Sequence, residues 1–419
     1  MTADKRSMKV LLVSLAFPPK QDAEVLQTAK LHKYLSSLPG VEVHVVTSNE
    51  SSRVSALLAP RLRLEEGVTR FDLFSNRYVN HAVLRFLPAL ASRPDLKRAA
   101  VARSQEICAV LPWRPDIILS RSYPISSALL GQAIAEKLDV PWIMQLSDPW
   151  SLSPLHPRGY DLEWNRVREH EAIARADRVT FTSIRTLKNY ASLYPTAVSR
   201  FRYFPNTYDP EHNTPNPWRR GDKFRLVYTG TLGGSRHPEI FFSAIDAFLE
   251  RVPQARGSIV FTIAGHADRE VRAYFAKCAD YLDWKGPVDF DTAMGLIRSA
   301  DVLSLIDNSM ERAAGTAKSA EGYEFFPSKL LDYMLGQRPI LGVSPTGSIA
   351  QELIESLELG LCFDHSDVAG LSKGIEQKWK EWQSGDPVHF ERNADDDTYD
   401  ARAAANRLYR EMESILDDA

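Results

Sequence analysis

Cysteine is scarce in this sequence, and a long hydrophobic run is missing. The 419 residues include three cysteines, Cys108, Cys278 and Cys362, which lie far apart and form no C-x-x-C pair. This pattern excludes a disulfide framework and a zinc site built from closely spaced cysteines, and it is typical of a reducing compartment. No segment reaches the roughly 18 apolar residues that a membrane-spanning helix needs. We therefore expect a cytoplasmic protein that does not cross a membrane.

An excess of positive charge and a signal peptide are also missing. The net charge of -3 disfavours nucleic acid as a partner, while 44% hydrophobic and 25% charged residues are typical of globular proteins. The apolar run at 10–17 is short, is interrupted by Ser14 and lacks a small-residue cleavage site. It therefore predicts a buried strand and not a secretory signal.

Short apolar segments alternate with amphipathic segments through both halves of the chain. This alternation predicts an α/β fold with parallel sheets that helices cover on both faces. In the first half, helices are expected at 23–37 and 124–138, and strands at 9–16, 41–47, 116–122, 141–148 and 178–183.

A proline-rich segment at 204–223 separates the two halves, and the alternation then resumes. Strands are expected at 224–232, 258–266, 301–309, 338–344 and 359–364. The length fits two doubly wound, Rossmann-like domains, at 1–206 and 223–397, joined by a linker at 207–222. A last helix is expected at 398–416.

Loops that follow the strands carry the candidate ligand-binding residues, because open α/β sheets bind ligands at the carboxyl ends of their strands. The first such loop of the second half reads YTGTLGGSRHPE. Gly230, Gly233 and Gly234 allow the backbone to approach a ligand, and Arg236 precedes a helix start that favours an anion. The loop fits a diphosphate cradle, or equally a tight turn with a surface arginine.

Two further loops of the second half carry weaker signals. Gly265 and His266 lie at the tip of the strand at 258–266, where a side chain can face a ligand, although a lone histidine is more often a surface or capping residue. Ser348 follows the strand at 338–344 and is expected to cap a helix that begins at Ile349.

The segment EFFPSKLLDYMLGQRP places two acids eight positions apart around a predicted helix. Pro327 suits the first helical position, and Glu324 stays in the preceding loop. A period of 3.6 residues assigns Leu330, Leu331, Met334 and Leu335 to the core face. It assigns Lys329, Asp332, Tyr333 and Gly336 to the opposite face, and Gly336 is expected to end the helix. A lysine can bind a phosphate and a carboxylate can accept hydrogen bonds from two sugar hydroxyls, so Glu324, Lys329 and Asp332 fit a nucleotide sugar. The alternative is that Lys329 and Asp332 are a solvent-exposed pair on the surface of the helix.

Four segments together resemble the retaining glycosyltransferases of the GT-B fold, family 4 in particular. They are VLLVSLAFPPKQDAEVLQTAKLHKYL, YTGTLGGSRHPEIFFSAI, GPVDFDTAMGLIRSADVLSLI and EFFPSKLLDYMLGQRPIL. The resemblance implies two Rossmann-like domains that face each other across a cleft, with the acceptor on the first and the donor on the second. It implies that the C-terminal segment 398–419 returns to the first domain. It also implies transfer of a sugar from a UDP-sugar, favoured over a GDP-sugar, with retention and without a metal or cofactor, in polysaccharide or glycolipid synthesis.

The resemblance assigns roles residue by residue. Glu324 would contact the transferred sugar, Asp332 the ribose hydroxyls, and Arg236 and Lys329 the diphosphate. The implied donor-binding set is Gly230, Thr231, Gly233, Gly234, Arg236, Gly265, His266, Ser328, Lys329 and Asp332.

The sequence also departs from the family at several of these positions. Asp332 is shorter than the usual glutamate, Arg236 replaces a usual lysine, and Thr231 stands where an arginine usually binds the diphosphate. Ala23 and Glu24 replace a frequent Gly-Gly pair.

The first half offers candidates for the acceptor side. Family histidines are missing from the loops at 120–124 and 146–150, where Arg121, Tyr123 and Asp148 are the polar candidates. The segment 77–103 is basic and amphipathic, which predicts peripheral contact with an anionic membrane and a lipid-linked acceptor. A core-packed helix with a solvated basic face is the alternative.

Three other functions compete with transfer. A non-catalytic nucleotide- or sugar-binding protein could retain this fold, although intact Glu324, Arg236, Lys329 and Asp332 argue against it. A nucleotide-sugar epimerase needs acids and bases around the hexose, and the absence of histidines in the first-domain loops disfavours it. A periplasmic binding protein would need the signal peptide that the sequence lacks.

Overall fold

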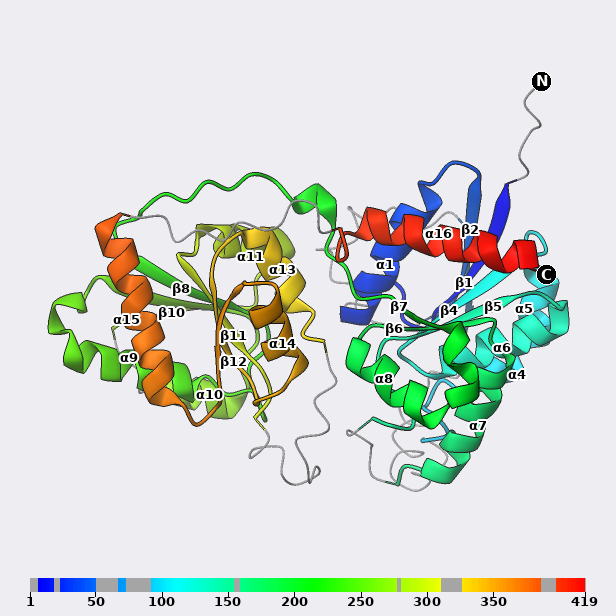
Figure 1. Cartoon of the computed structure of the whole chain (residues 1–419), viewed down its shortest axis with the longest axis horizontal. Coiled ribbons are helices and arrows are strands. Elements are labelled where there is room, and N and C mark those ends of the chain that lie inside the picture. The colour runs from blue at the N-terminus through cyan, green and yellow to red at the C-terminus, as the bar shows by residue number, and fades with distance from the viewer. Residues whose placement is uncertain are drawn as a thin grey trace. The chain divides into compact units, whose positions relative to one another are not determined.

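The computed structural model describes residues 7–18, 23–49, 67–72, 92–153, 159–276, 280–309, 326–385 and 397–418. These residues form two compact units (Figure 1). The first unit comprises Met1–Pro210 together with Asp397–Ala419, and the second comprises Glu211–Asp396. Each unit is built around its own parallel sheet.

The sheet of the first unit has seven strands in the order β3-β2-β1-β4-β5-β6-β7, and all neighbouring pairs are parallel. Its central strands are completely buried, as strands covered on both faces should be. The strands are β1 (Met8–Val13), β2 (Val41–Asn49), β3 (Val68–Asp72), β4 (Ile117–Ser122), β5 (Trp142–Leu146), β6 (Arg178–Phe181) and β7 (Phe201–Tyr203).

Helices cover both faces of this sheet and produce two separate hydrophobic clusters. One face packs against α4 (Ala99–Ala102), α5 (Ser104–Val110), α6 (Ser126–Leu138), α7 (Leu162–Arg175) and α8 (Ile184–Leu193). The other face packs against α1 (Ala23–Ser36) and α16 (Ala401–Asp418), which contact each other (Figure 1). The last helix of the chain therefore belongs to the core of the first unit.

The sheet of the second unit has six parallel strands in the order β10-β9-β8-β11-β12-β13. The strands are β8 (Phe224–Thr229), β9 (Ile259–Ala264), β10 (Leu282–Gly286), β11 (Val302–Ile306), β12 (Ile340–Val343) and β13 (Gly360–Phe363). The helices are α9 (Glu239–Arg251), α10 (Arg269–Phe275), α11 (Phe290–Ser299), α13 (Lys329–Gly336), α14 (Ile349–Ser356) and α15 (Val368–Ser384).

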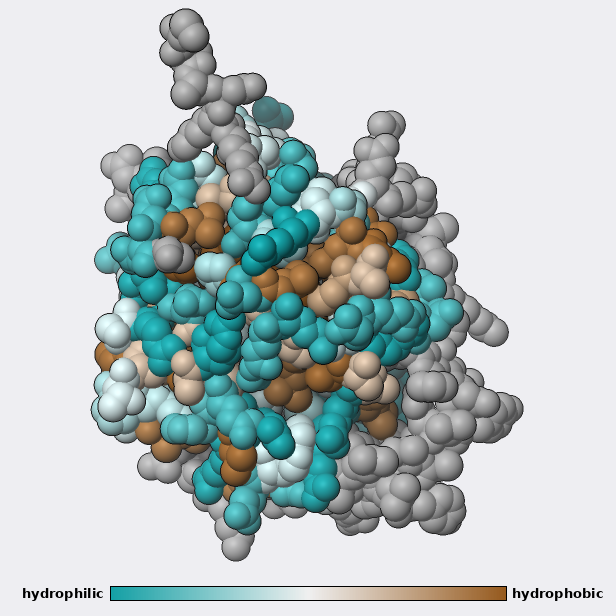
Figure 2. Space-filling view, turned by 90° about the vertical axis from the view of Figure 1, so that its right-hand side faces the viewer, coloured by the Kyte–Doolittle hydropathy of each residue, from teal (hydrophilic) through white to brown (hydrophobic). Residues whose placement is uncertain are grey.

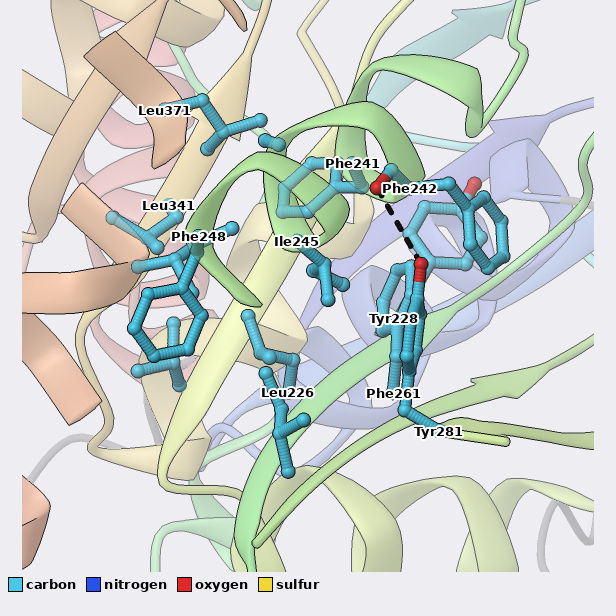
Figure 3. Close-up of a cluster of buried hydrophobic side chains, with 14 of the residues drawn as sticks. Leu226, Tyr228, Phe241, Phe242, Ile245, Phe248, Phe261, Tyr281, Leu341 and Leu371 are labelled. Atoms are coloured by element: carbon cyan, nitrogen blue, oxygen red, sulfur yellow. Dashed lines mark hydrogen bonds between the residues drawn. The ribbon is translucent and has the colours of Figure 1, made fainter. Parts of the chain in front are cut away.

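Aromatic side chains dominate the core of the second unit (Figure 3). Phe241, Phe242 and Phe248 of α9 pack onto strand residues that include Leu226 and Phe261. Each fully buried side chain of this size contributes roughly 1.5–3 kcal/mol through removal of apolar surface from water. This packing fixes β8 and β9, which carry the candidate site at their carboxyl ends.

The ten expected strands are all present, and three more were missed. The missed strands are β3, β7 and β10, and each lies at an edge of its sheet. An edge strand is paired on one side only and is less buried, so its sequence need not be continuously apolar. VTRFD and LDWKG show this mixed character.

The segment around α13 differs from expectation in three details. The helix begins at Lys329 and not at Pro327. Tyr333 and Gly336 are buried and do not lie on a polar face. Gln337, with φ 53°, takes the left-handed position after the helix, while a Cβ on Gly336 would lie 2.6 Å from the Ile297 side chain. Gly336 is therefore the last residue of α13, as expected, but it permits close packing against α11 and does not supply the left-handed residue after the helix.

Hydrophobic residues on one face of the molecule form separate patches within a mainly hydrophilic surface (Figure 2). Within the part of the chain that the structure describes, no helix combines the length and the apolar character that crossing a membrane requires.

Candidate active site

Two glycines meet at the carboxyl edge of the second sheet. β8 and β9 end in register at Thr229 and Ala264, so Gly230 and Gly265 follow side by side. A Cβ on Gly265 would lie 2.0 Å from the carbonyl oxygen of Gly230, and both residues have positive φ. Only glycine fits such a backbone approach. The two backbones therefore lie in direct contact at this edge.

The glycine loop after β8 folds into a tight turn that the protein itself stabilises. Gly233 and Arg236 exchange backbone hydrogen bonds of 2.9 and 3.1 Å. The N–H of Gly234 donates to Oδ2 of Asp268 (3.1 Å), which also caps α10. These backbone bonds lower the pKa of Asp268. Because these glycine N–H groups already have partners, the charge for an anion must come from side chains.

Arg236 supplies one of these charges. Its Nη2 lies 3.9 Å from Oδ1 of Asp307, too far for a strong hydrogen bond, and its Nε is buried without a partner among the residues described here. Oδ2 of Asp307 is held by the hydroxyl of Ser344 (3.0 Å). The hydroxyl of Ser348 lies 2.6 Å from that of Ser344 and caps α14, as expected. The guanidinium is therefore oriented but incompletely satisfied.

Lys329 supplies the second charge, at the first residue of α13. Its Nζ donates to the hydroxyl of Tyr228 (2.7 Å) and lies 4.2 Å from the centre of that ring. A Cβ on Gly230 would come within 2.9 Å of Nζ, so the glycine also makes room for the ammonium. Burial, and then the nearby Arg236, hold the pKa of Lys329 well below its usual range.

Tyr333 docks α13 onto the sheet. Its hydroxyl accepts the N–H of Thr229 and donates to the carbonyl of Ser304, both at 3.0 Å. Burial raises the pKa of this phenol to about 12. The preceding residue, Asp332, is partly exposed on the same helix. The tyrosine therefore fixes where Lys329 and Asp332 lie relative to β8 and β11.

The remaining predicted donor residues lie around this centre. Thr231 and His266 are exposed; Ser328 is partly exposed directly before α13. The Thr231 carbonyl accepts the Tyr228 hydroxyl (3.0 Å), and the His266 carbonyl accepts the N–H of Leu232 (2.8 Å). Glu324 lies outside the described residues.

In the first unit, Arg121 is enclosed in a polar cluster at the carboxyl edge of the sheet. Only 2% of its surface is exposed. Its Nε lies 2.7 Å from Oε1 of Glu24, and its Nη2 donates to Oδ1 of Asn206 (2.9 Å). The hydroxyl of Ser147 also donates to Oε1 of Glu24 (2.8 Å). The glutamate that replaces a family glycine therefore pairs with the arginine.

Two other acceptor-side candidates border this cluster. Burial raises the pKa of Asp148 to about 6, although the charge of Arg121 opposes the shift. Tyr123 is 52% exposed. Tyr123 is thus exposed and Asp148 is half-buried, whereas Arg121 is enclosed beneath them.

The residues that sequence reasoning missed are Tyr228, Asp307, Asp268, Glu24 as a partner of Arg121, and Asn206. Asp307 directly follows β11, but the strand expected at 301–309 included it, and Asn206 follows β7, a strand that the sequence did not indicate, so neither residue stood out. Tyr228 lies within an apolar strand and gives no signal either. Among the residues that the structure describes, no cluster of three or more His, Cys, Asp or Glu side chains could hold a metal ion.

A family model matches much of the first unit. The model describes a glycosyl transferase 4-like domain and matches residues 27–207. The match contains Arg121, Asp148 and Asn206, and the second unit follows it.

Solved structures with the same fold cover the whole chain. HepE from Anabaena in complex with UDP is 14% identical, with a TM-score of 0.63 over 97% of this chain and 100% of its own. A glycosyltransferase from Rickettsia africae is 10% identical, with a TM-score of 0.66 over 99% and 100%. A putative UDP-N-acetylglucosamine 2-epimerase from Listeria monocytogenes is 14% identical, with a TM-score of 0.62 over 99% and 98%. A search of curated proteins found none that matches this sequence.

Together, the glycosyl transferase 4-like domain and the two parallel sheets identify the GT-B fold. The resemblance to family 4 glycosyltransferases is therefore confirmed.

Glu24 is expected to make the stability of the first unit pH-dependent. Because burial raises its pKa from 4.5 to about 7, the folded state favours the neutral carboxyl, and stability falls as the pH rises through this range. Glu24→Gln stays neutral at every pH. Urea titrations measure the free energy of unfolding of the variant minus that of the wild type. This difference should increase by up to about 3 kcal/mol as the pH rises from about 4.5 to about 8. Glu42→Gln, at an exposed position, is the control, and equal pH profiles for the two variants would contradict the prediction.

Proposed function

We propose that this chain is a glycosyltransferase whose donor site is the carboxyl edge of the second sheet. The observation that carries the proposal is the convergence of Arg236 and Lys329 beside Gly230, with Asp307 as the nearby carboxylate. Two cations beside this backbone edge fit the diphosphate of a nucleotide sugar.

The reaction breaks the bond between the anomeric carbon and the diphosphate oxygen, and an acceptor hydroxyl oxygen bonds to that carbon and loses its proton. Negative charge develops on the departing diphosphate. Arg236 and Lys329 stabilise this charge from fixed positions, which is a large contribution to catalysis in a site with little water. With two side-chain cations available, the reaction needs no metal. Transfer with retention follows the family that the sequence resembles.

The two acids act on the sugars of the donor. Asp332, one turn beyond Lys329 on α13, accepts the ribose hydroxyls, and Glu324 contacts the transferred sugar. We favour a UDP-sugar over a GDP-sugar because UDP donors are common in the family and because the fold-related HepE was solved with UDP.

The acceptor lies on the glycosyl transferase 4-like domain, with Asp148 and Tyr123 as its contacts. A carboxylate accepts a hydrogen bond from a sugar hydroxyl, and an exposed aromatic ring packs on a sugar face. We propose a sugar, glycolipid or lipid-linked acceptor in cell-surface polysaccharide or glycolipid synthesis. The basic segment 77–103 would bring the protein to the inner face of the membrane; most of it lies outside the described residues.

Nucleotide binding without metal tests the proposal. UDP, GDP, ADP and their sugars are titrated calorimetrically into the wild type and Asp332→Ala, with and without EDTA. We expect one diphosphate to bind equally well in EDTA and to bind about tenfold more weakly to Asp332→Ala, because the ribose loses a charge-assisted hydrogen bond. Asp291→Ala, in the exposed first turn of α11, is the control. Absence of binding, or equal binding by both variants, would contradict the donor-site proposal.

An epimerase is the second candidate, because Glu24 and Asp148 place two carboxyl groups with raised pKa at the edge of the first sheet. An epimerase inverts a sugar carbon of the nucleotide sugar itself. Proton NMR of UDP-N-acetylglucosamine incubated with the protein alone separates the two functions. A new hexose configuration without any acceptor indicates an epimerase, whereas an unchanged hexose favours transfer.

A further inference from the structure

Tyr228 occupies an unusual place beneath the candidate donor site. It is the penultimate residue of β8, is completely buried, and lies within the aromatic core of the second unit (Figure 3). Yet its hydroxyl reaches the polar edge of the sheet. That hydroxyl donates to the Thr231 carbonyl (3.0 Å) and accepts from Nζ of Lys329 (2.7 Å).

The two hydrogen bonds of the Tyr228 hydroxyl determine which group donates in each. Because the phenol proton is committed to the Thr231 carbonyl, the phenol oxygen must accept from Lys329. The ring face adds a cation–π contact at 4.2 Å. Both contacts favour the charged ammonium, and no carboxylate of the described residues forms an ion pair with Lys329.

The groups that face Lys329 are unevenly charged. Arg236 from the glycine loop is positive, and Asp307 after β11 is negative and already serves Arg236 and Ser344. Tyr228 and Tyr333 are buried phenols whose pKa values burial raises, and Asp332 lies on the same helix as the lysine. The surroundings of Lys329 therefore combine a guanidinium that repels the ammonium with a carboxylate that is shared with Arg236 and Ser344.

We propose that Tyr228 is the positioning residue that holds Lys329 beside the glycine turn, and that a nucleoside diphosphate binds there together with a proton that the Lys329 amine takes up. The proposal rests on the proposed donor site and adds a residue and a linked proton to it. Tyr228 itself does not touch the ligand; it acts through the lysine.

The sign of the proton linkage follows from the electrostatics. Burial and Arg236 lower the pKa of Lys329 in the free protein, which favours the neutral amine. A bound diphosphate favours the ammonium, so binding raises this pKa and consumes a proton. Affinity should therefore fall as the pH rises. Removing the Tyr228 hydroxyl lowers the free-state pKa further, so the fall in affinity should begin at a lower pH.

The test is calorimetric titration of UDP, and in parallel of GDP, between about pH 6 and about pH 9. Each pH is measured in two buffers of different ionisation enthalpy, so that the heat reports the number of protons taken up. Above about pH 8 the terminal phosphate, whose second pKa is about 6, is almost fully ionised and does not itself take up the proton. The proteins are the wild type, Tyr228→Phe, Lys329→Gln and Tyr281→Phe.

Tyr281→Phe is the matched control. Tyr281 belongs to the same aromatic cluster (Figure 3) and directly precedes β10, at the end of that strand away from the carboxyl edge. Its hydroxyl donates to Oδ1 of Asp246 (2.8 Å). The variant Tyr281→Phe therefore loses a buried tyrosine hydroxyl without affecting Lys329. Thermal unfolding of both variants checks that each folds.

We expect proton uptake in the wild type and none in Lys329→Gln. Tyr228→Phe should bind about tenfold more weakly than the wild type at the high end of the pH range, and this difference should shrink towards the low end. Tyr281→Phe should match the wild type throughout. If Tyr228→Phe loses the same factor at every pH, or if binding takes up no proton, the inference is wrong while the donor site stands. If no nucleotide binds the wild type, both are wrong.

Discussion

Arg236→Ala is expected to weaken the binding of a nucleoside diphosphate by about 10- to 100-fold, because hydrogen bonds to charged groups contribute roughly 1.5–3 kcal/mol. The guanidinium has capacity for such bonds: its Nε is buried without a partner in the described part of the chain, and its Nη2 lies 3.9 Å from Asp307. The loss should appear in calorimetric titrations with UDP or GDP. Arg236→Lys, which restores the residue usual in the family, should recover most of the affinity.

Two comparisons make this result specific. Arg272→Ala removes an exposed arginine of α10 in the same unit, and it should bind as the wild type does. Asp307→Asn removes the partial counter-charge of Arg236 and should leave binding intact or strengthen it, because the anion then competes with no carboxylate. An Arg236→Ala protein that binds the diphosphate with wild-type affinity would mean that the glycine loop is a structural turn.

The sequence contains enough information for the parallel sheets and for the edge that carries the site. Continuous apolar runs are required wherever helices cover both faces of a sheet, so the central strands stand out. Glycines and charged residues directly after those strands then indicate the binding edge. Arg236 and Lys329 were found in this way, and the structure brings both of them near Tyr228 and Asp307.

What escaped prediction depends on contacts between distant residues. Tyr228 reads as one more core residue of β8, and only the fold brings Lys329, about a hundred positions later, onto its ring. Glu24 reads as a departure from a glycine pair, and only the fold pairs it with Arg121. Helical periodicity also misplaced Tyr333, because its hydroxyl is buried against backbone groups of two strands.

The loop that carries Asp148 depends on a buried glutamate of α7. Glu169 is fully buried and accepts hydrogen bonds from the N–H and hydroxyl of Ser151 and from the hydroxyls of Tyr190 and Tyr194. Tyr190 in turn accepts the N–H of Trp150 (2.8 Å). Four donors thus converge on one carboxyl group, directly behind the loop that follows β5.

Replacing Glu169 with leucine should lower the free energy of unfolding of the first unit by about 3–5 kcal/mol, as measured in urea. The loss of the carboxyl leaves the Ser151 N–H buried without a partner, and hydroxyls that rotate cannot replace it. Glu169→Gln should cost only about 1 kcal/mol, because its amide oxygen still accepts that N–H while the hydroxyls turn to accept from its NH₂. Burial raises the pKa of Glu169, so the glutamine variant should also gain stability relative to the wild type as the pH rises above about 4.5.

The neighbouring residue Glu171 separates this effect from a general loss of charge on α7. It is exposed and pairs with Arg168 at 2.6 Å, one turn earlier, and such surface pairs contribute about 0–1 kcal/mol. Glu171→Leu should therefore unfold close to the wild type, and equal losses in Glu169→Leu and Glu171→Leu would contradict the argument. Because Ser151 follows Asp148 by three residues, Glu169→Leu should also weaken use of the acceptor more than binding of the nucleotide, which belongs to the other unit. If Glu169→Leu weakens use of the acceptor but not binding of the nucleotide, the hydrogen bonds of Glu169 position the loop after β5 in addition to stabilising the core.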